Sequence, residues 1–281
     1  MKYSYAFLAL ASYVSAHGVI TAVTGANGVT MPGLSVIDGT PRDCATPACG
    51  SEADTSIIRS KELGTSKASA LGRTNGGGPV DAEAAIATFM GTSTANKKRG
   101  LANLLGGGNS ASGASSAGTK TAKGTTEQGV AKAAGTGKTS GLPTTADDGT
   151  ITMTFHQVNQ DGAGPLTAQI DATSGGTDPS AFKDAQVTQN VPGIGIGGLS
   201  AATTTDFPVK VQMPAGMTCS ANVGGASNVC IVRLQNSALA GPFGGSAAFT
   251  QSPAARKRAI EYNLRKRHIA RGLLGKAEEE A

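Results

Sequence analysis

The chain contains 281 residues, with 40 glycines, 4% aromatic residues and no tryptophan. This composition is typical of a protein built from short strands and loops, and no apolar run is long enough for a transmembrane helix. The formal net charge is +5, but residues 91–141 have a net charge of +6 and residues 256–281 of +4. Without these segments and Lys2, the body has a net charge of −6, which excludes a nucleic-acid-binding domain with a basic face.

The first sixteen residues have the pattern of a secretory signal peptide. Lys2 is positively charged, residues 5–14 form a short apolar core, and Ser15 and Ala16 are small residues suited to a peptidase. We expect cleavage after Ala16, which makes His17 the first residue of the mature protein. The chain is therefore predicted to be secreted, and to reside outside the cell or at the cell wall or surface.

Four cysteines in an exported chain favour two disulfides, for which three connectivities are possible. The pairs that are close in sequence, Cys44–Cys49 and Cys219–Cys230, are the most favourable. The connectivity itself stays open at this point.

Short apolar or alternating segments recur along the chain and predict strands. They comprise 17–23, 31–36, 150–156, 166–170, 187–191, 207–213, 229–234 and 247–251. Within 150–156, Ile151, Met153 and Phe155 share one face and His156 lies on the other. About eight short strands with few helices predict a mostly β fold, a β-sandwich.

Helical signals are confined to the N-terminal part and the end of the chain. Residues 80–90 should form a helix that Pro79 starts and Gly91 ends, and residues 52–63 a shorter one. The Gly, Ala, Ser, Thr and Lys residues of 91–141 bury too little apolar surface for regular structure and predict a disordered insertion. The basic C-terminal tail should be weakly helical and exposed.

These signals divide the chain into one interrupted domain with appendages. The signal peptide is 1–16, the sandwich is formed by 17–90 and 142–251, the insertion is 91–141, and the basic tail is 252–281. We expect a monomer. The basic appendages suit a polysaccharide or protein of the cell wall or host surface as a partner.

Several motifs resemble those of fungal Egh-like proteins, a family of secreted, appressorium-associated virulence factors. They cover most of the mature chain outside the insertion and comprise 17–20, 75–81, 153–165, 189–193, 213–219, 228–233 and 236–245. The resemblance implies secretion during host penetration and a role in virulence. It does not imply a particular reaction.

A fainter resemblance is to copper-dependent lytic polysaccharide monooxygenases, which place a mature N-terminal histidine on an immunoglobulin-like sandwich. It implies copper as the cofactor, with the amine and imidazole of His17, the imidazole of His156 and the carboxylate of Asp161 at the metal. The chain departs from that pattern at Ala163, because the oxygenases place their second histidine directly before the Gly-Pro pair.

The sequence alone therefore leaves three hypotheses for the function. The first is a non-catalytic protein of the cell surface that acts in host penetration. The second is a copper enzyme that cleaves a wall polysaccharide oxidatively, and the third is copper binding without catalysis. Whether the chain is an enzyme, and what its catalytic residues would be, stays undetermined at this stage.

Overall fold

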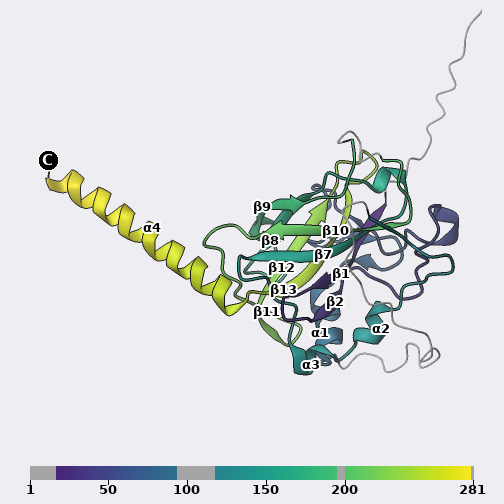
Figure 1. Ribbon diagram of the computed structural model, residues 1–281, viewed down its shortest axis with the longest axis horizontal. Helices are drawn as coiled ribbons and strands as arrows, with labels where there is room; N and C mark the ends of the chain where they lie inside the picture. Colours follow the sequence, from purple (N-terminus) through teal and green to yellow (C-terminus); the bar gives the residue numbers. More distant parts are fainter. Residues whose placement is uncertain (1–16, 94–117, 195–199, 280–281) are drawn as a thin grey trace, which may run out of the picture.

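A computed structural model describes residues 17–93, 118–194 and 200–279 (Figure 1). The predicted signal peptide, 1–16, lies outside the described residues. The chain is mostly β, as predicted, and the strands pair antiparallel in one large sheet. The strands are β1 (Gly18–Thr24), β2 (Thr30–Pro32), β3 (Ser56–Ile57), β4 (Arg73–Thr74), β5 (Gly78–Pro79), β6 (Thr119–Lys120), β7 (Thr150–Gln157), β8 (Thr167–Asp171), β9 (Phe182–Gln189), β10 (Thr205–Gln212), β11 (Ala221–Val223), β12 (Ala226–Gln235) and β13 (Phe243–Thr250).

The helices are few and mostly short. They are α1 (Ala82–Met90), α2 (Gly129–Ala133), α3 (Gly137–Ser140) and α4 (Pro253–Glu279), with 3₁₀ turns η1 (Pro47–Cys49), η2 (Gln160–Gly162) and η3 (Pro179–Ala181). In Figure 1, α1, α2 and α3 lie together at one end of the strands, and α4 extends away from the body.

The main path of the sheet runs β2-β1-β7-β10-β9-β8-β12-β13-β3-β4-β5. Because β9 pairs with both β10 and β8, it joins the half that contains β1 and β7 to the half that contains β12 and β13. Strand β13 also packs against β1: a Cβ added at Gly245 would lie 2.8 Å from the backbone nitrogen of Ile20. Glycine at this position therefore permits the close approach of the two strands.

Strand β7 is the element that positions the histidines. Its Ile151, Met153 and Phe155 are buried in the main core, as the alternation predicts. Its partner β1 places Val19 opposite His156, and its partner β10 places Asp206 opposite the same residue. His156 thus lies in the middle of three paired strands.

Helix α1 confirms the predicted helix but begins two residues later. The carboxylate of Asp81, rather than Pro79, caps it by accepting a hydrogen bond from the backbone N–H of Ala84 at 3.0 Å. Gly91 ends it in the left-handed conformation, with φ of 70°.

The helix predicted for 52–63 is wrong. Residues 51–54 form turns, and Ser56–Ile57 forms β3, which pairs with β13. The buried carboxylate of Asp54 accepts a hydrogen bond from the N–H of Ile37 and binds Arg42, so tertiary contacts determine the local structure. Helix propensity is a weak preference that such contacts override.

The expectation of an irregular segment over 91–141 is also wrong for its second half. Residues 118–141 form β6, α2 and α3, while residues 94–117 lie outside the described residues. The carboxylate of Asp38 accepts hydrogen bonds from the N–H groups of Val130 and Ala131, and Arg42 binds Glu127. The segment is therefore held by polar contacts to the body rather than by apolar residues of its own.

The predicted weakly helical tail forms the continuous helix α4. Its Ala255 and Ala259 are buried against the body, and the side chain of Asn263 donates to the carbonyl of Gly216 at 2.8 Å. Within the described residues, no helix is both long and apolar enough to cross a membrane.

Candidate binding site at the mature N-terminus

His17 lies at the start of β1 and is 4% exposed. Its carbonyl accepts a hydrogen bond from the N–H of Val158 at 3.0 Å, which continues the pairing of β1 with β7. Its backbone nitrogen donates to Oδ1 of Asn159 at 2.9 Å, and its ring centroid lies 4.5 Å from that of Phe243. The predicted first residue of the mature protein is thus held on its backbone and on its ring.

Glu52 provides a carboxylate beside the imidazole of His17. Its Oε1 lies 3.1 Å from Nδ1 of His17, and Nδ2 of Asn159 donates to the same oxygen at 3.4 Å. Burial raises the pKa of Glu52 to about 7. The site therefore combines the backbone nitrogen of His17, which the predicted cleavage would turn into an amine, with an imidazole and a desolvated carboxyl group.

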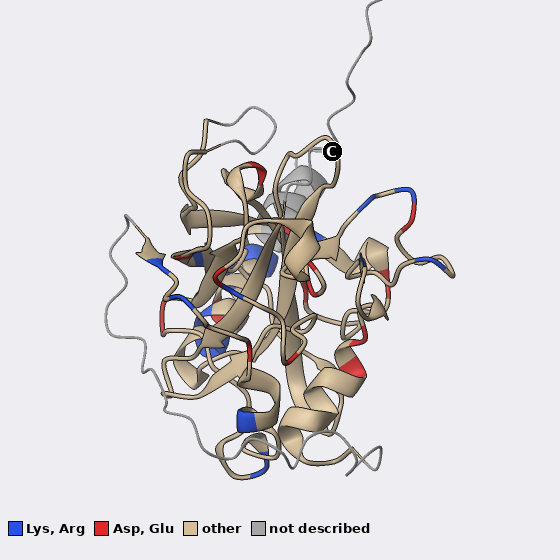
Figure 2. Ribbon diagram, turned by 90° about the vertical axis from the view of Figure 1, so that its right-hand side faces the viewer, with Lys and Arg blue, Asp and Glu red and all other residues tan. Residues whose placement is uncertain are grey.

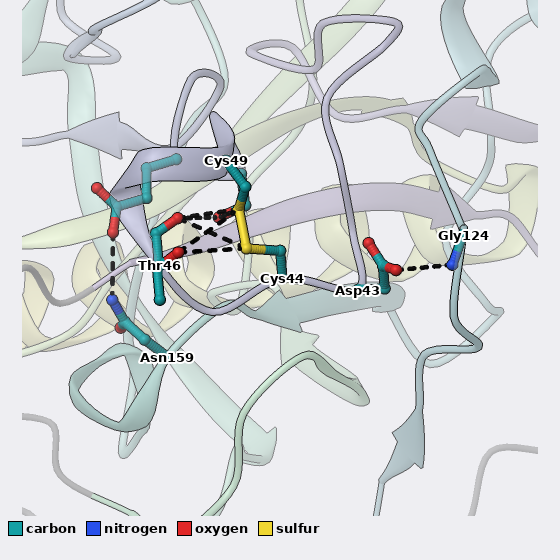
Figure 3. Close-up of a disulfide and its surroundings, with 8 residues drawn as sticks. Asp43, Cys44, Thr46, Cys49, Gly124 and Asn159 are labelled. Carbon is teal, nitrogen blue, oxygen red and sulfur yellow. Dashed lines mark hydrogen bonds between the residues drawn. A yellow bond between two sulfur atoms is a disulfide. The ribbon is translucent and has the colours of Figure 1, made fainter.

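The Cys44–Cys49 disulfide closes the loop that leads into Glu52. Figure 3 shows this disulfide with Asn159 in its surroundings. On the other side of the loop, the carboxylate of Asp43 accepts a hydrogen bond from the N–H of Gly124 at 2.6 Å. Both predicted disulfides are present, and the second, Cys219–Cys230, lies in the main core.

His156 has a different carboxylate partner. It is 1% exposed, and its Nδ1 lies 2.7 Å from Oδ1 of Asp206. Its Nε2 is buried and has no hydrogen-bond partner among the residues that the structure describes. An imidazole whose one nitrogen binds a carboxylate has its ring orientation fixed and its other nitrogen available to a ligand.

Asp161 lies in η2, in the loop that follows β7. Its carbonyl accepts a hydrogen bond from Nδ2 of Asn236 at 3.2 Å, and burial raises the pKa of its carboxyl group. Across 17–93, 118–194 and 200–279, no three His, Cys, Asp or Glu side chains form a group able to hold a metal ion.

Sequence reasoning did not identify Glu52, Asn159 or Asp206. Glu52 was placed in a helix that does not form, and Asp206 lies one residue before the predicted start of its strand. Asn159 follows the predicted strand 150–156 and has no periodic signal of its own. The pairing of β1, β7 and β10 brings these side chains to the histidines, and alternation along one strand carries no information on its partners.

The charges of the body are distributed over loops as well as strands, as Figure 2 shows for acidic and basic residues. Comparison of the chain with known families matches residues 15–244 to the Egh16-like virulence factor family. The chain belongs to this family.

Two relatives define the relationship more closely. The chain is 63% identical over 299 aligned residues, covering all of both chains, to the appressoria-specific virulence factor GAS2 of Pyricularia oryzae. It is 30% identical over 263 residues to the appressoria-specific virulence factor GAS1 of the same fungus, covering 92% of this chain and 83% of the relative. No solved structure matches the chain.

Proposed function

We propose that this chain acts outside the fungal cell during host penetration, as a non-catalytic virulence protein that binds copper at its mature N-terminus. The similarity to two appressoria-specific virulence factors supports an action during host penetration. Two disulfides support an oxidising compartment, since such bonds are rare in the cytosol.

The observation that carries the copper proposal is the position of His17. Cleavage after Ala16 gives this residue a free amine next to its own Nδ1, so one residue supplies two nitrogen donors. Nitrogen donors together with a carboxylate oxygen are the donors that a tetragonal Cu(II) site prefers. Glu52, with Oε1 3.1 Å from Nδ1 of His17, is placed to supply that oxygen.

The neighbouring residues have supporting roles in this proposal. Asn159 accepts a hydrogen bond from the nitrogen of His17 and donates to Glu52, so it orients both groups. His156, whose ring Asp206 holds and whose Nε2 is buried, is the second imidazole expected from the sequence, but the described structure does not group it with His17 and Glu52 as a third side-chain ligand. Asp161 is the remaining member of that expected set.

Copper titration of the correctly processed protein tests the proposal. Mass spectrometry first establishes His17 as residue one. We expect binding at neutral pH, and we expect His17→Ala to weaken it by about 100-fold or more, because second-shell partners alone account for 10–100-fold. His156→Ala and Asp161→Asn measure the contributions of those residues, and His268→Ala, on an exposed turn of α4, is the matched control. Unchanged affinity in His17→Ala would refute copper binding at this site.

A second candidate function is a copper-dependent enzyme that cleaves a wall polysaccharide. It is favoured by the unpartnered Nε2 of His156 within the described residues, because Asp206 holds this ring as a carboxylate holds a metal-ligating histidine. Copper when bound would supply the redox chemistry, while the chain's own residues orient the N-terminus. Oxidised sugars released in the presence of a reductant and dioxygen would establish this function, and their absence with tight copper binding supports the non-catalytic one.

A further inference from the structure

Helix α4 extends away from the body (Figure 1) and is rich in basic residues. Two groups of cations lie along it, Arg256-Lys257-Arg258 and Arg265-Lys266-Arg267, and Glu261 is the one acidic residue between them. All six basic side chains are exposed, and among the described residues no salt bridge joins any of them to an acidic group.

The two groups differ in their contacts with the body. Arg256 donates to Oδ1 of Asn228 at 3.0 Å, and Arg258 donates to the carbonyl of Asp147. Arg265, Lys266 and Arg267 follow Asn263, whose hydrogen bond to Gly216 is the last side-chain hydrogen bond between α4 and the body in the described part of the chain. The second group is therefore free to meet a partner.

The arrangement of the cations indicates what kind of partner fits. Successive residues of a helix point about 100° apart, so the three charges of each group point to three different sides of the helix. The groups are about 14 Å apart along the axis. A rigid acidic patch would meet only one side, whereas a flexible linear polyanion can wrap around the helix and meet all of them.

The exposed apolar residues of α4 argue against a membrane surface. Ile260 and Leu264 lie on one side, and Tyr262 and Ile269 lie on the opposite side, because residues four and seven apart share a face. A helix that binds in the bilayer interface needs one continuous apolar face, which the described part of α4 lacks. Association of two α4 helices is disfavoured by the repulsion between their like charges.

We infer that α4 is a binding arm for an acidic polysaccharide, a linear polymer that carries carboxylates along its length. Arg265, Lys266 and Arg267 form the primary contact, and Arg256, Lys257 and Arg258 extend it toward the body. This role is separate from the His17 site and does not depend on copper.

Binding of the full mature chain to immobilised polygalacturonate, with neutral dextran as reference, tests the inference. The variant Arg265→Gln/Lys266→Gln/Arg267→Gln should weaken binding by about tenfold or more, since three charge contacts of 0.5 kcal/mol or so each correspond to that factor. The control Lys61→Gln/Lys67→Gln/Lys210→Gln removes three exposed body charges and should change the affinity by less than about twofold. Binding should also be lost near 1 M salt, where the Debye length is about 3 Å.

Circular dichroism of both variants, which should match the parent spectrum, separates lost charge from lost helix. If both triple variants weakened binding to polygalacturonate equally, the net charge of the protein rather than the position of the charges on α4 would explain binding. This result would overturn the inference. So would the absence of binding to polygalacturonate, or binding confined to phosphatidylcholine vesicles that contain phosphatidylserine.

Discussion

Two buried clusters of charged and polar groups lie on either side of the Cys44–Cys49 loop, and they differ in how well their charges are compensated. Before the loop, Arg42 binds Asp54 through Nη1 at 2.9 Å and Glu127 through Nε at 3.1 Å. Burial alone would lower the pKa of Arg42, but the carboxylates of Asp54 and Glu127 outweigh it and raise this pKa.

After the loop, Glu52 has no such cation beside it. Its neighbours are the imidazole of His17 and the amide of Asn159, and burial raises its pKa to about 7. A cluster with matched charges stabilises the fold, whereas a desolvated carboxyl group beside an imidazole is typical of a binding site. On this basis we propose a structural role for the Arg42 cluster and a binding role for the His17 site.

The largest effect is expected in the Arg42 cluster. Arg42→Met leaves the carboxylates of Asp54 and Glu127 buried without a cation, and should lower the free energy of unfolding by about 3–5 kcal/mol. Urea unfolding measures this loss. The control Arg59→Met removes a partly exposed ion pair with Glu62 and hydrogen bonds to the carbonyls of Ala240 and Gly241, and should cost about 1–2 kcal/mol. Similar losses in both variants would contradict the structural role.

Asp171 extends the comparison to a carboxylate that is compensated by hydrogen bonds alone. It is fully buried and accepts from the N–H groups of Thr173, Ser174 and Gly176. Burial would raise its pKa, but these bonds and that from the Ser174 hydroxyl lower it. Asp171→Asn should cost about 1–3 kcal/mol at neutral pH.

The pH dependence of that cost follows from the direction of the shift. Because the pKa of Asp171 is lower in the folded state, its stabilisation is present above the unfolded value, about 3.9, and is lost as the pH falls through the folded value. The difference between the parent and Asp171→Asn should therefore shrink below about pH 4. A difference that stays constant down to pH 2 or so would show that the carboxylate is not the stabilising form.

The smallest effect on stability is expected at Glu52. A carboxyl group whose pKa is raised on folding stabilises most below its unfolded pKa, about 4.3, and this contribution is lost as the pH rises through about 7. Glu52→Gln should therefore flatten the dependence of unfolding free energy on pH between these values. At pH 8 or so its stability should equal or exceed that of the parent.

For copper affinity the order of the two effects should reverse, with substitution of Glu52 having a larger effect than substitution of Arg42. Glu52→Gln should weaken copper binding by about 10–100-fold while leaving the fold stable. Thermal unfolding and copper titration of the same samples check both statements. A strong loss of stability in Glu52→Gln, with unchanged copper affinity, would make this cluster structural as well.

Much of the fold could be predicted because local signals agree with it. The alternation of Ile151, Met153 and Phe155 gives the buried face of β7, and the short spacing of Cys44 and Cys49 gives one disulfide. These features depend on residues close in sequence, where periodicity and loop length are informative.

The candidate site could be predicted only in part, because its contacts join distant segments. The amine of His17 followed from the cleavage pattern, but Glu52 and Asn159 reach it from 35 and 142 residues away. The order in 118–141 likewise depends on Arg42 and Glu127, which are 85 residues apart. Such pairs leave no periodic pattern in a single sequence.

The central claim is that the free amine of His17 makes the N-terminus a copper site. It is tested most directly by titrating copper into the mature protein and into a form with one added N-terminal Gln. That residue cyclises to pyroglutamate, so the added form has no free amine while the imidazole of His17 remains. We expect tight one-to-one binding by the mature protein and binding at least about 100-fold weaker by the added form. Equal affinities in the two forms would contradict it.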